Sequence, residues 1–99
     1  MAKFLLTHKA VEDLTSIWEY TYDTWSERQA NKYYALLIQA CQEISSKPKR
    51  GKVYDDIAPG IMGHVAYRHL ILYKIISPKE VLIVRILHGQ MDLKSKGLE

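Results

Sequence analysis

The sequence has only one cysteine, Cys41, among its 99 residues, so no disulfide can form within the chain. Its hydrophobic runs are far shorter than the ~20 residues that a membrane-spanning helix needs. The first residues, MAKFLLTHKA, lack the apolar core of a signal peptide. One cysteine and four histidines show no metal-ligand spacing, so neither a metal site nor a cofactor is predicted. These absences predict a soluble protein of the cytoplasm, where thiols stay reduced.

The composition that is present is typical of one globular domain. Hydrophobic residues make up 47% and charged residues 25% of the sequence, which excludes a disordered chain. A length of 99 residues predicts a single domain over residues 1–99 with a thin core. The formal net charge of +3 is mildly basic. It permits nucleic acid or an acidic protein as a partner without choosing between them.

Two amphipathic helices are predicted in the first half of the chain. A strand over residues 3–6 precedes a helix over residues 8–22, which Thr7 can cap. Ser26 opens a capping box for a second helix, and Pro48 ends that helix within one or two residues. The short connection predicts an antiparallel hairpin. The inner stripes of the two helices are Val11, Leu14, Trp18, Tyr22 and Trp25, and Ala30, Tyr33, Leu37, Cys41 and Ile44.

The second half changes to strand-like patterns after a basic turn over residues 47–52 and a loop over residues 53–60. Strands are predicted over residues 61–66, 69–76 and 81–88. Three strands alone cannot cover their own apolar face, so the helical hairpin must pack on them. The predicted fold is therefore a two-layer α+β domain of order β-α-α-β-β-β. Its N-terminal helical hairpin packs on an antiparallel sheet, which the first strand joins.

Nearly the whole chain carries a set of short stretches in a characteristic order. They are Lys9-Ala10 through Asp13-Leu14, Ile17-Trp18-Glu19-Tyr20-Thr21, Trp25, Gln29-Ala30, Tyr33, Pro48, Gly51, Arg68 through Lys74, and Ile83 through Gly89 with Met91-Asp92. Together they resemble the ParE toxins of the RelE/ParE superfamily of bacterial toxin–antitoxin systems. The chain departs from that pattern at Gln90, where arginine is expected. It also departs at Gly63-His64, in a strand that often carries more basic residues.

The resemblance implies two helices packed on a twisted antiparallel sheet, and a growth-inhibiting toxin. A ParD-like antitoxin would neutralise it by wrapping the toxin with a C-terminal segment and laying an amphipathic helix in its groove. For ParE-type members the implied target is DNA gyrase, trapped with its DNA cleaved. For RelE-type relatives it is mRNA, cut in the ribosomal A site.

The interpretation that we favour is a non-catalytic toxin that inhibits gyrase by binding it and is held inactive by an acidic antitoxin segment. The first alternative is an enzyme, a ribosome-dependent endoribonuclease. The second is an inactive relic that still binds its antitoxin.

Arg85 lies within the most apolar run of the chain, VLIVRILH. Strand alternation places it on one face with Ile83 and Leu87. An unpaired guanidinium in the core would cost several kcal/mol, so we expect Arg85 on the open face of the sheet or at its rim. It would bind either a partner's anion or a carboxylate of this chain. The candidate carboxylates are Asp55, Asp56 and Asp92.

A cluster of basic residues is predicted where two strands of the meander meet. His88 ends the last strand and His69 starts the one before it, next to Arg68, so antiparallel pairing brings the two histidines together. A nuclease would use His88, Arg85 and Arg68 as acid–base and cationic groups. The structural interpretation, that both histidines bond to backbone at strand ends, is preferred. The predicted target-binding face comprises Arg85, His88, Arg68, His69 and Asp92.

Six aromatic residues at helical spacing are expected mainly in the core. They are Trp18, Tyr20, Tyr22, Trp25, Tyr33 and Tyr34. Because a small domain cannot hide all of them, some are expected to line a groove for the antitoxin helix. The predicted groove residues are Trp18, Tyr22, Trp25, Tyr33 and Leu37. The basic run 47–52, KPKRGK, could bind phosphates. The preferred interpretation is that it is a solvated helix end, where cations suit the helix dipole.

Overall fold

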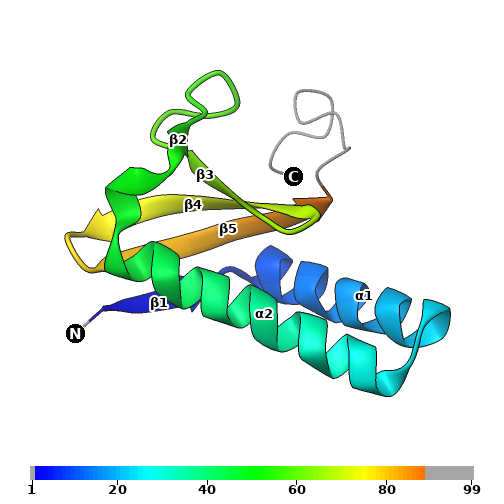
Figure 1. Ribbon diagram of the computed structural model, residues 1–99. Helices are drawn as coiled ribbons and strands as arrows, with labels where there is room; N and C mark the ends of the chain where they lie inside the picture. Colours follow the sequence, from blue (N-terminus) through cyan, green and yellow to red (C-terminus); the bar gives the residue numbers. More distant parts are fainter. Residues whose placement is uncertain (1, 89–99) are drawn as a thin grey trace.

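The computed structural model describes residues 2–88 and has the predicted α+β architecture (Figure 1). No helix in this part of the chain combines the length and the apolar composition that a membrane crossing requires. In chain order the elements are β1 (Lys3–Leu6), α1 (His8–Thr24), α2 (Glu27–Ser46), the 3-10 helix η1 (Pro48–Arg50), β2 (Lys52–Val53), β3 (Met62–Ala66), β4 (His69–Ser77) and β5 (Glu80–His88).

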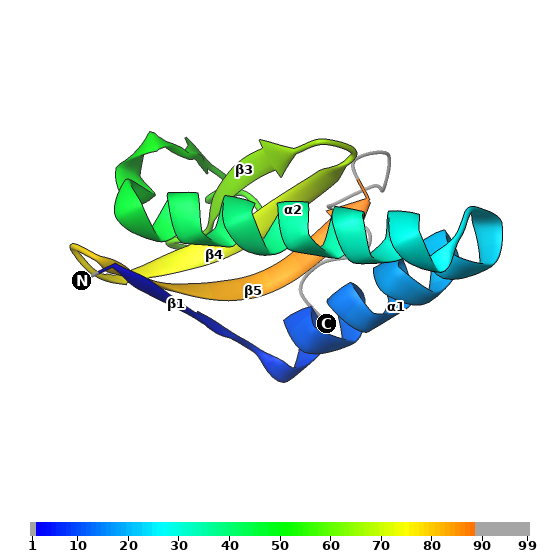
Figure 2. The same ribbon diagram turned by 60° about the horizontal axis from the view of Figure 1, so that its bottom comes forward.

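The five strands form one sheet in the order β1-β5-β4-β3-β2. β1 runs parallel to β5, and the other neighbours are antiparallel. The sheet is therefore mixed, and not wholly antiparallel as predicted. The α1–α2 hairpin returns the chain to the end of the sheet at which β1 begins, and β5 therefore runs in the same direction as β1. Both helices cover one side of the sheet (Figure 2). β5 lies between β1 and β4, so the run that carries Arg85 is an inner strand over its first half.

Side-chain caps fix where both helices begin. The Thr7 hydroxyl accepts a hydrogen bond from the Ala10 amide at 3.0 Å, and the Ser26 hydroxyl accepts one from the Gln29 amide at 3.0 Å. α1 continues to Thr24, two residues beyond the predicted end. α2 ends at Ser46, and Pro48 starts η1. The predicted hairpin and its boundaries are thus confirmed to within two residues.

The sheet has an apolar cluster on each face. The main core, between the sheet and the helices, contains Leu14, Leu37, Ile71, Tyr73 and Ile83 among others. The opposite face was expected to be open, but a second cluster covers part of it. This cluster comprises Ile61, Leu70, Leu72 and Leu87, with Tyr54, Ala58 and Val84 packed against them. The segment between β2 and β3 therefore covers part of the far side of the sheet.

The predicted aromatic inner face of α1 is wrong. The buried residues of α1 are Ala10, Leu14 and Thr21. The aromatic side chains point outward: the exposed fraction is 68% for Tyr20, 48% for Tyr22, 73% for Trp25 and, on α2, 41% for Tyr34. The small residues allow the helix to approach β5 closely, which turns the bulky residues toward solvent.

A β-bulge in β5 changes the predicted facing of its side chains. Leu72 pairs with Arg85 and Tyr73 pairs with Ile83, so Val84 has no partner of its own on β4. Ile83 packs in the main core, whereas Leu87 packs in the cluster on the far face. Arg85 therefore does not share one face with both Ile83 and Leu87. Simple alternation fails here because one extra residue shifts the register by half a period.

Candidate functional site

Arg85 lies at the rim of the sheet and binds Asp13 of α1. Its Nε donates to Asp13 Oδ2 at 2.8 Å and its Nη2 donates to Asp13 Oδ1 at 3.0 Å. The two side chains are only 16% and 15% exposed. The rim was one of the two predicted places. Asp13 was not among the three carboxylates that were predicted, and one of those, Asp92, lies outside the described residues. The hydrogen bonds that Arg85 donates to Asp13 raise the pKa of the guanidinium despite its burial, so Arg85 stays charged.

Asp13 also completes the edge of β5, where β1 has already ended. Its Oδ2 accepts a hydrogen bond from the Ile86 amide at 2.9 Å, and the Thr7 hydroxyl donates to the Val84 carbonyl at 2.7 Å. Two side chains thus replace the backbone partners that a longer β1 would supply. Sequence reasoning missed this role of Asp13. The sequence did offer one indication of this role. Asp13 is an acidic residue next to Leu14 and three residues after Ala10, so it lies near the face of α1 that packs inward.

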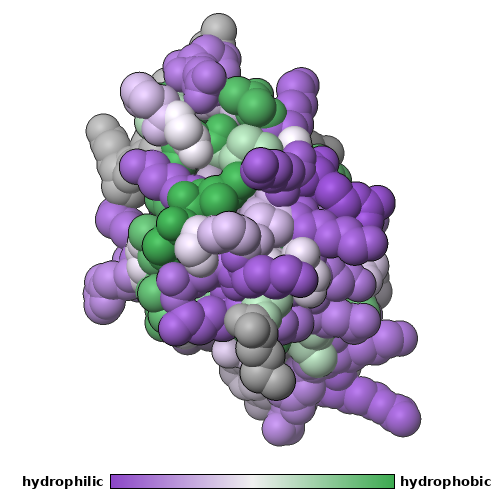
Figure 3. Space-filling view, turned by 90° about the vertical axis from the view of Figure 1, so that its left-hand side faces the viewer, coloured by the Kyte–Doolittle hydropathy of each residue, from purple (hydrophilic) through white to green (hydrophobic). Residues whose placement is uncertain are grey.

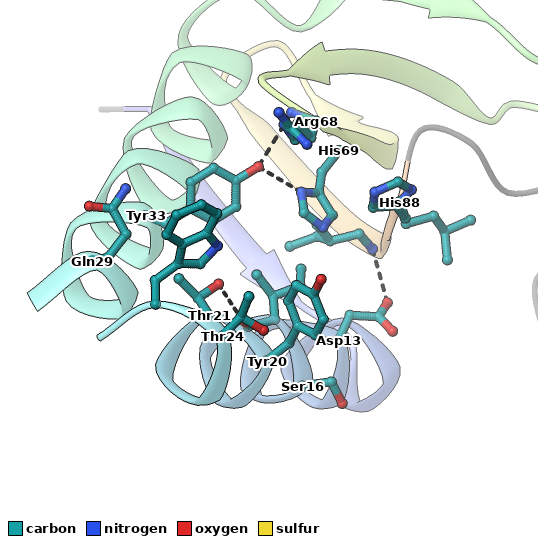
Figure 4. A pocket seen from close by; sticks show the side chains of 14 residues that line it. Asp13, Ser16, Tyr20, Thr21, Thr24, Gln29, Tyr33, Arg68, His69 and His88 are labelled. Carbon is teal, nitrogen blue, oxygen red and sulfur yellow. Dashed lines mark hydrogen bonds between the residues drawn. The ribbon is translucent and has the colours of Figure 1, made fainter. Parts of the chain in front are cut away.

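The two histidines meet as predicted, at the open end of the β4–β5 pair. His69 is the register partner of His88, and their ring centroids lie 5.6 Å apart at 82°. The Tyr33 hydroxyl of α2 lies 2.7 Å from His69 Nδ1 and accepts a hydrogen bond from the Arg68 amide at 3.3 Å. Figure 4 shows Tyr33, Arg68, His69 and His88 around this end of the groove, with Asp13 below them.

Burial sets the protonation of this cluster. Burial and the neighbouring His88 lower the pKa of His69, and Asp13 opposes that shift. Burial also raises the pKa of Tyr33, so its hydroxyl keeps its proton. A protonated Tyr33 can donate to Nδ1 of a neutral His69, which leaves the ring proton on Nε2. Near neutral pH this histidine is thus an uncharged hydrogen-bonding group.

A groove of about 720 Å³ runs from this cluster along α1 to the α1–α2 turn. Its walls are Asp13, Ser16, Ile17, Tyr20, Thr21, Thr24, Trp25, Gln29, Tyr33, Arg68, His69, Ile86, Leu87 and His88. The basic side chains Arg68, His69 and His88 lie at the sheet end, where Tyr33 contacts His69, and the aromatic side chains Tyr20 and Trp25 line the helical walls. This division suits a ligand that has both an apolar side and a charged side.

The five predicted groove residues do not all line this groove. Trp25 and Tyr33 do. The rings of Trp18 and Tyr22 stack with their centroids 5.2 Å apart. Trp18 Nε1 donates a hydrogen bond to Asn31 Oδ1 of α2 at 2.9 Å. They form a separate surface patch on the hairpin. Leu37 is fully buried in the main core and has no surface to offer.

Tyr20 lines the groove and was not predicted to do so. It lies two residues from both Trp18 and Tyr22 on the helix, which places it on another face. The usable signal was its four-residue spacing from Ser16 and Thr24, which also line the groove.

Comparison with known proteins identifies the family. The sequence profile described as "ParE toxin of type II toxin-antitoxin system, parDE" matches residues 4–93. The chain belongs to this ParE toxin family. It is 33% identical over 92 residues to Toxin ParE1 of Mycobacterium tuberculosis, which covers 93% of this chain and 94% of the relative. It is 26% identical over 95 residues to Toxin ParE1 of Caulobacter vibrioides, covering 96% and 97%.

A solved structure shares the fold of this ParE family member. The structure titled "Chromosomal ParDE TA system from P. aeruginosa" matches with a TM-score of 0.77 over 91% of this chain and 98% of that chain. The identity is 18%, so the match shows the fold alone. Residues 2–88 contain no group of three histidine, cysteine or acidic side chains that could hold a metal ion.

Proposed function

We propose that this ParE family member inhibits DNA gyrase in the cytoplasm by binding it, without catalysing a reaction. The gyrase target is inferred from membership of the ParE family, and the observation that supports a non-catalytic mode is the ion pair between Arg85 and Asp13. Two guanidinium nitrogens of Arg85 donate to Asp13, and most of the surface of this side chain is buried inside the protein. A cation held in this way stabilises the sheet rim, and it cannot clamp a scissile phosphate without leaving Asp13 buried and unpaired. The target-binding face that we propose comprises Arg68, His69 and His88, and Asp92 of the predicted face lies outside the described residues.

The endoribonuclease alternative has one observation in its favour. Tyr33, Arg68, His69 and His88 converge at one end of the groove, where an acid, a base and a cation would be needed. Against it, the lowered pKa of His69 makes that ring a poor general acid near neutral pH. Among the residues of this cluster, Arg68 is the one that carries a permanent positive charge, and its side chain is exposed to solvent.

A ParD-like antitoxin is proposed to neutralise the toxin by filling the groove. An amphipathic helix can place its apolar side against Tyr20, Trp25 and Tyr33 and its acidic side near Arg68. The aromatic residues are large and partly exposed, which is the usual character of residues that dominate binding energy at an interface. An occupied groove would also cover His69 and His88, which is how we propose that the antitoxin blocks binding of the target.

The decisive experiment induces the chain alone in bacteria and follows DNA breaks and transcript integrity in the same culture. The proposal predicts broken DNA with intact transcripts, and rescue when the antitoxin is co-expressed. Arg68→Ala and His88→Ala are compared with His64→Ala, which removes a histidine on β3 away from the groove. Cut transcripts with intact DNA, abolished by His88→Ala, would establish the nuclease instead. Normal growth with a folded chain would indicate the inactive relic.

A further inference from the structure

A second surface, at the opposite end of α2, gathers positive charge that the proposed function does not use. It is the basic turn, defined here as Lys47, Lys49, Arg50 and Lys52, around η1. α2 has 20 residues, so about 30 Å separates this turn from the groove end near Gln29. Figure 1 shows η1 at one end of α2 and the α1–α2 turn at the other. In Figure 3, which faces the η1 side, long hydrophilic side chains project from much of the surface.

The helix dipole does not account for these cations. Its effect is confined to the last turn of a helix, and the last turn of α2 has no basic residue. Lys49, Arg50 and Lys52 all follow the helix. Within residues 2–88, none of the four forms an ion pair with a carboxylate. Lys52 lies over the ring of Tyr54 at 5.4 Å. Four like charges within six residues repel each other, and a bound external anion would relieve that repulsion.

The backbone of the basic turn is fixed by contacts with Tyr73 of β4. The Tyr73 side chain is 1% exposed, and its hydroxyl donates to the Pro48 carbonyl at 2.6 Å. Gly51 approaches so closely that an added Cβ would lie 2.1 Å from the Tyr73 hydroxyl oxygen. The backbone that carries the cations is thereby anchored to β4. An anchored turn loses less conformational entropy on binding than a mobile one.

A cavity of about 480 Å³ opens beside the turn. Lys47 and Arg50 line it together with Ser46, His64 and the buried Tyr73, and Glu43 supplies the one carboxylate. Within the turn itself the only apolar side chain, Pro48, is buried. The exposed Val53 follows the turn, but the turn itself presents three lysines, and lysine is depleted from the centres of protein interfaces. Binding at this surface must be electrostatic, which is how proteins hold the phosphodiester backbone of DNA.

We propose that the basic turn binds the phosphate backbone of duplex DNA without reading its sequence. The inference goes beyond the proposed function because it concerns a different surface and holds for any toxin target. The cations would contact successive phosphates, and each contact releases counterions. Affinity should therefore fall steeply as salt rises and should not depend on the base sequence.

The test measures binding of the purified chain, without antitoxin, to a fluorescent duplex of about 25 base pairs and arbitrary sequence at several salt concentrations. The first variant combines Lys47→Gln, Lys49→Gln, Arg50→Gln and Lys52→Gln. The matched control combines Lys9→Gln, Arg28→Gln, Lys32→Gln and Lys79→Gln, which are exposed cations outside the basic turn. Each set removes four charges and takes the formal net charge from +3 to −1. Thermal melting confirms that both variants fold.

The turn variant is expected to bind at least about tenfold more weakly. The slope of log K against log salt should become shallower by about 0.9 for each phosphate that the variant no longer neutralises. The control should keep most of the affinity and the slope. Equal weakening of the two variants would overturn the proposal in favour of general charge attraction. Absence of binding by the unaltered chain would overturn it too. If the turn variant lost binding to polyglutamate but not to the duplex, the site would be one for acidic protein.

Discussion

At the scale of single residues, Asp13 is the side chain on which the end of the sheet near His69 and His88 depends. It neutralises Arg85 and caps the Ile86 amide at once. Removing the charge alone leaves a buried guanidinium uncompensated, which is more costly than removing both partners. Asp13→Asn should therefore lower the free energy of unfolding by about 3 kcal/mol.

Urea unfolding measures this loss, and Asp23→Asn on the exposed end of α1 is the control, with little expected change. The double variant Asp13→Asn with Arg85→Gln should recover part of the stability. If the double variant were less stable than Asp13→Asn, the two side chains would not be acting as a pair.

His69 makes stability depend on pH in a defined direction. Its pKa is lowered in the folded state, first by burial and then by His88, below the ordinary value of 6.5. The unfolded chain therefore binds more protons than the folded chain as pH falls through 6.5, and the free energy of unfolding decreases in that window. Above it, both states are neutral and His69 contributes no pH dependence.

Urea unfolding between about pH 5 and pH 8, the range in which histidines titrate, measures the effect. His69→Gln should flatten the curve in this range, whereas His64→Gln should leave it in place. A steeper decline in His69→Gln than in the unaltered chain would show that the assigned direction is wrong.

At the scale of elements, the contact between β4 and η1 controls the shape of the basic turn. The Tyr73 hydroxyl is the buried donor for the Pro48 carbonyl. Tyr73→Phe leaves that carbonyl without its partner, so a loss of about 1–3 kcal/mol is expected. Tyr22→Phe, at an exposed position on α1, is the matched control and should change the unfolding free energy little. Denaturant unfolding with both variants checks the prediction. Equal stability of the two would mean that water replaces the hydroxyl.

The secondary-structure elements also show which structural features local sequence patterns can predict. The caps at Thr7 and Ser26 and the break at Pro48 are local chemistry, so the helix boundaries could be predicted. The inward face of α1 could not, because a stripe through Val11 and a stripe through Ala10 both include Leu14 at helical spacing. Which one turns inward depends on how closely the helix approaches the sheet.

The facing of β5 was unpredictable for a similar reason. The bulge at Val84 has no signature of its own in an apolar run, so alternation placed Leu87 on the wrong side relative to Ile83. The His69–His88 meeting was predictable, since it follows from antiparallel pairing alone. Asp13 was not, because its partner lies 72 residues away and no local pattern links them.

At the scale of the whole molecule, the groove and the basic turn divide the surface into two separate regions. The groove takes its shape from both layers, since α1, α2, β4 and β5 all contribute walls. A partner that fills it therefore stabilises the packing of helices on sheet. Binding to the folded state alone raises the melting temperature as the partner concentration increases. The residues of the basic turn are not among the walls of this groove.

The aromatic residues distinguish which surface of the hairpin receives the antitoxin. Trp25 lines the groove, while Tyr22 stacks on Trp18 outside it. Trp25→Ala should weaken antitoxin binding by about 2 kcal/mol, roughly 30-fold, because a large aromatic anchor is removed. Tyr22→Ala removes a side chain of comparable character on the same helical hairpin and should change the affinity by less than about twofold.

Calorimetric titration of the antitoxin's C-terminal segment into each purified variant measures both affinities. The reverse result, with Tyr22→Ala weakened and Trp25→Ala unaffected, would move the docking surface to the Trp18–Tyr22 patch. The groove would then remain available to the target while antitoxin is bound, and neutralisation would have to act by another route than covering His69 and His88.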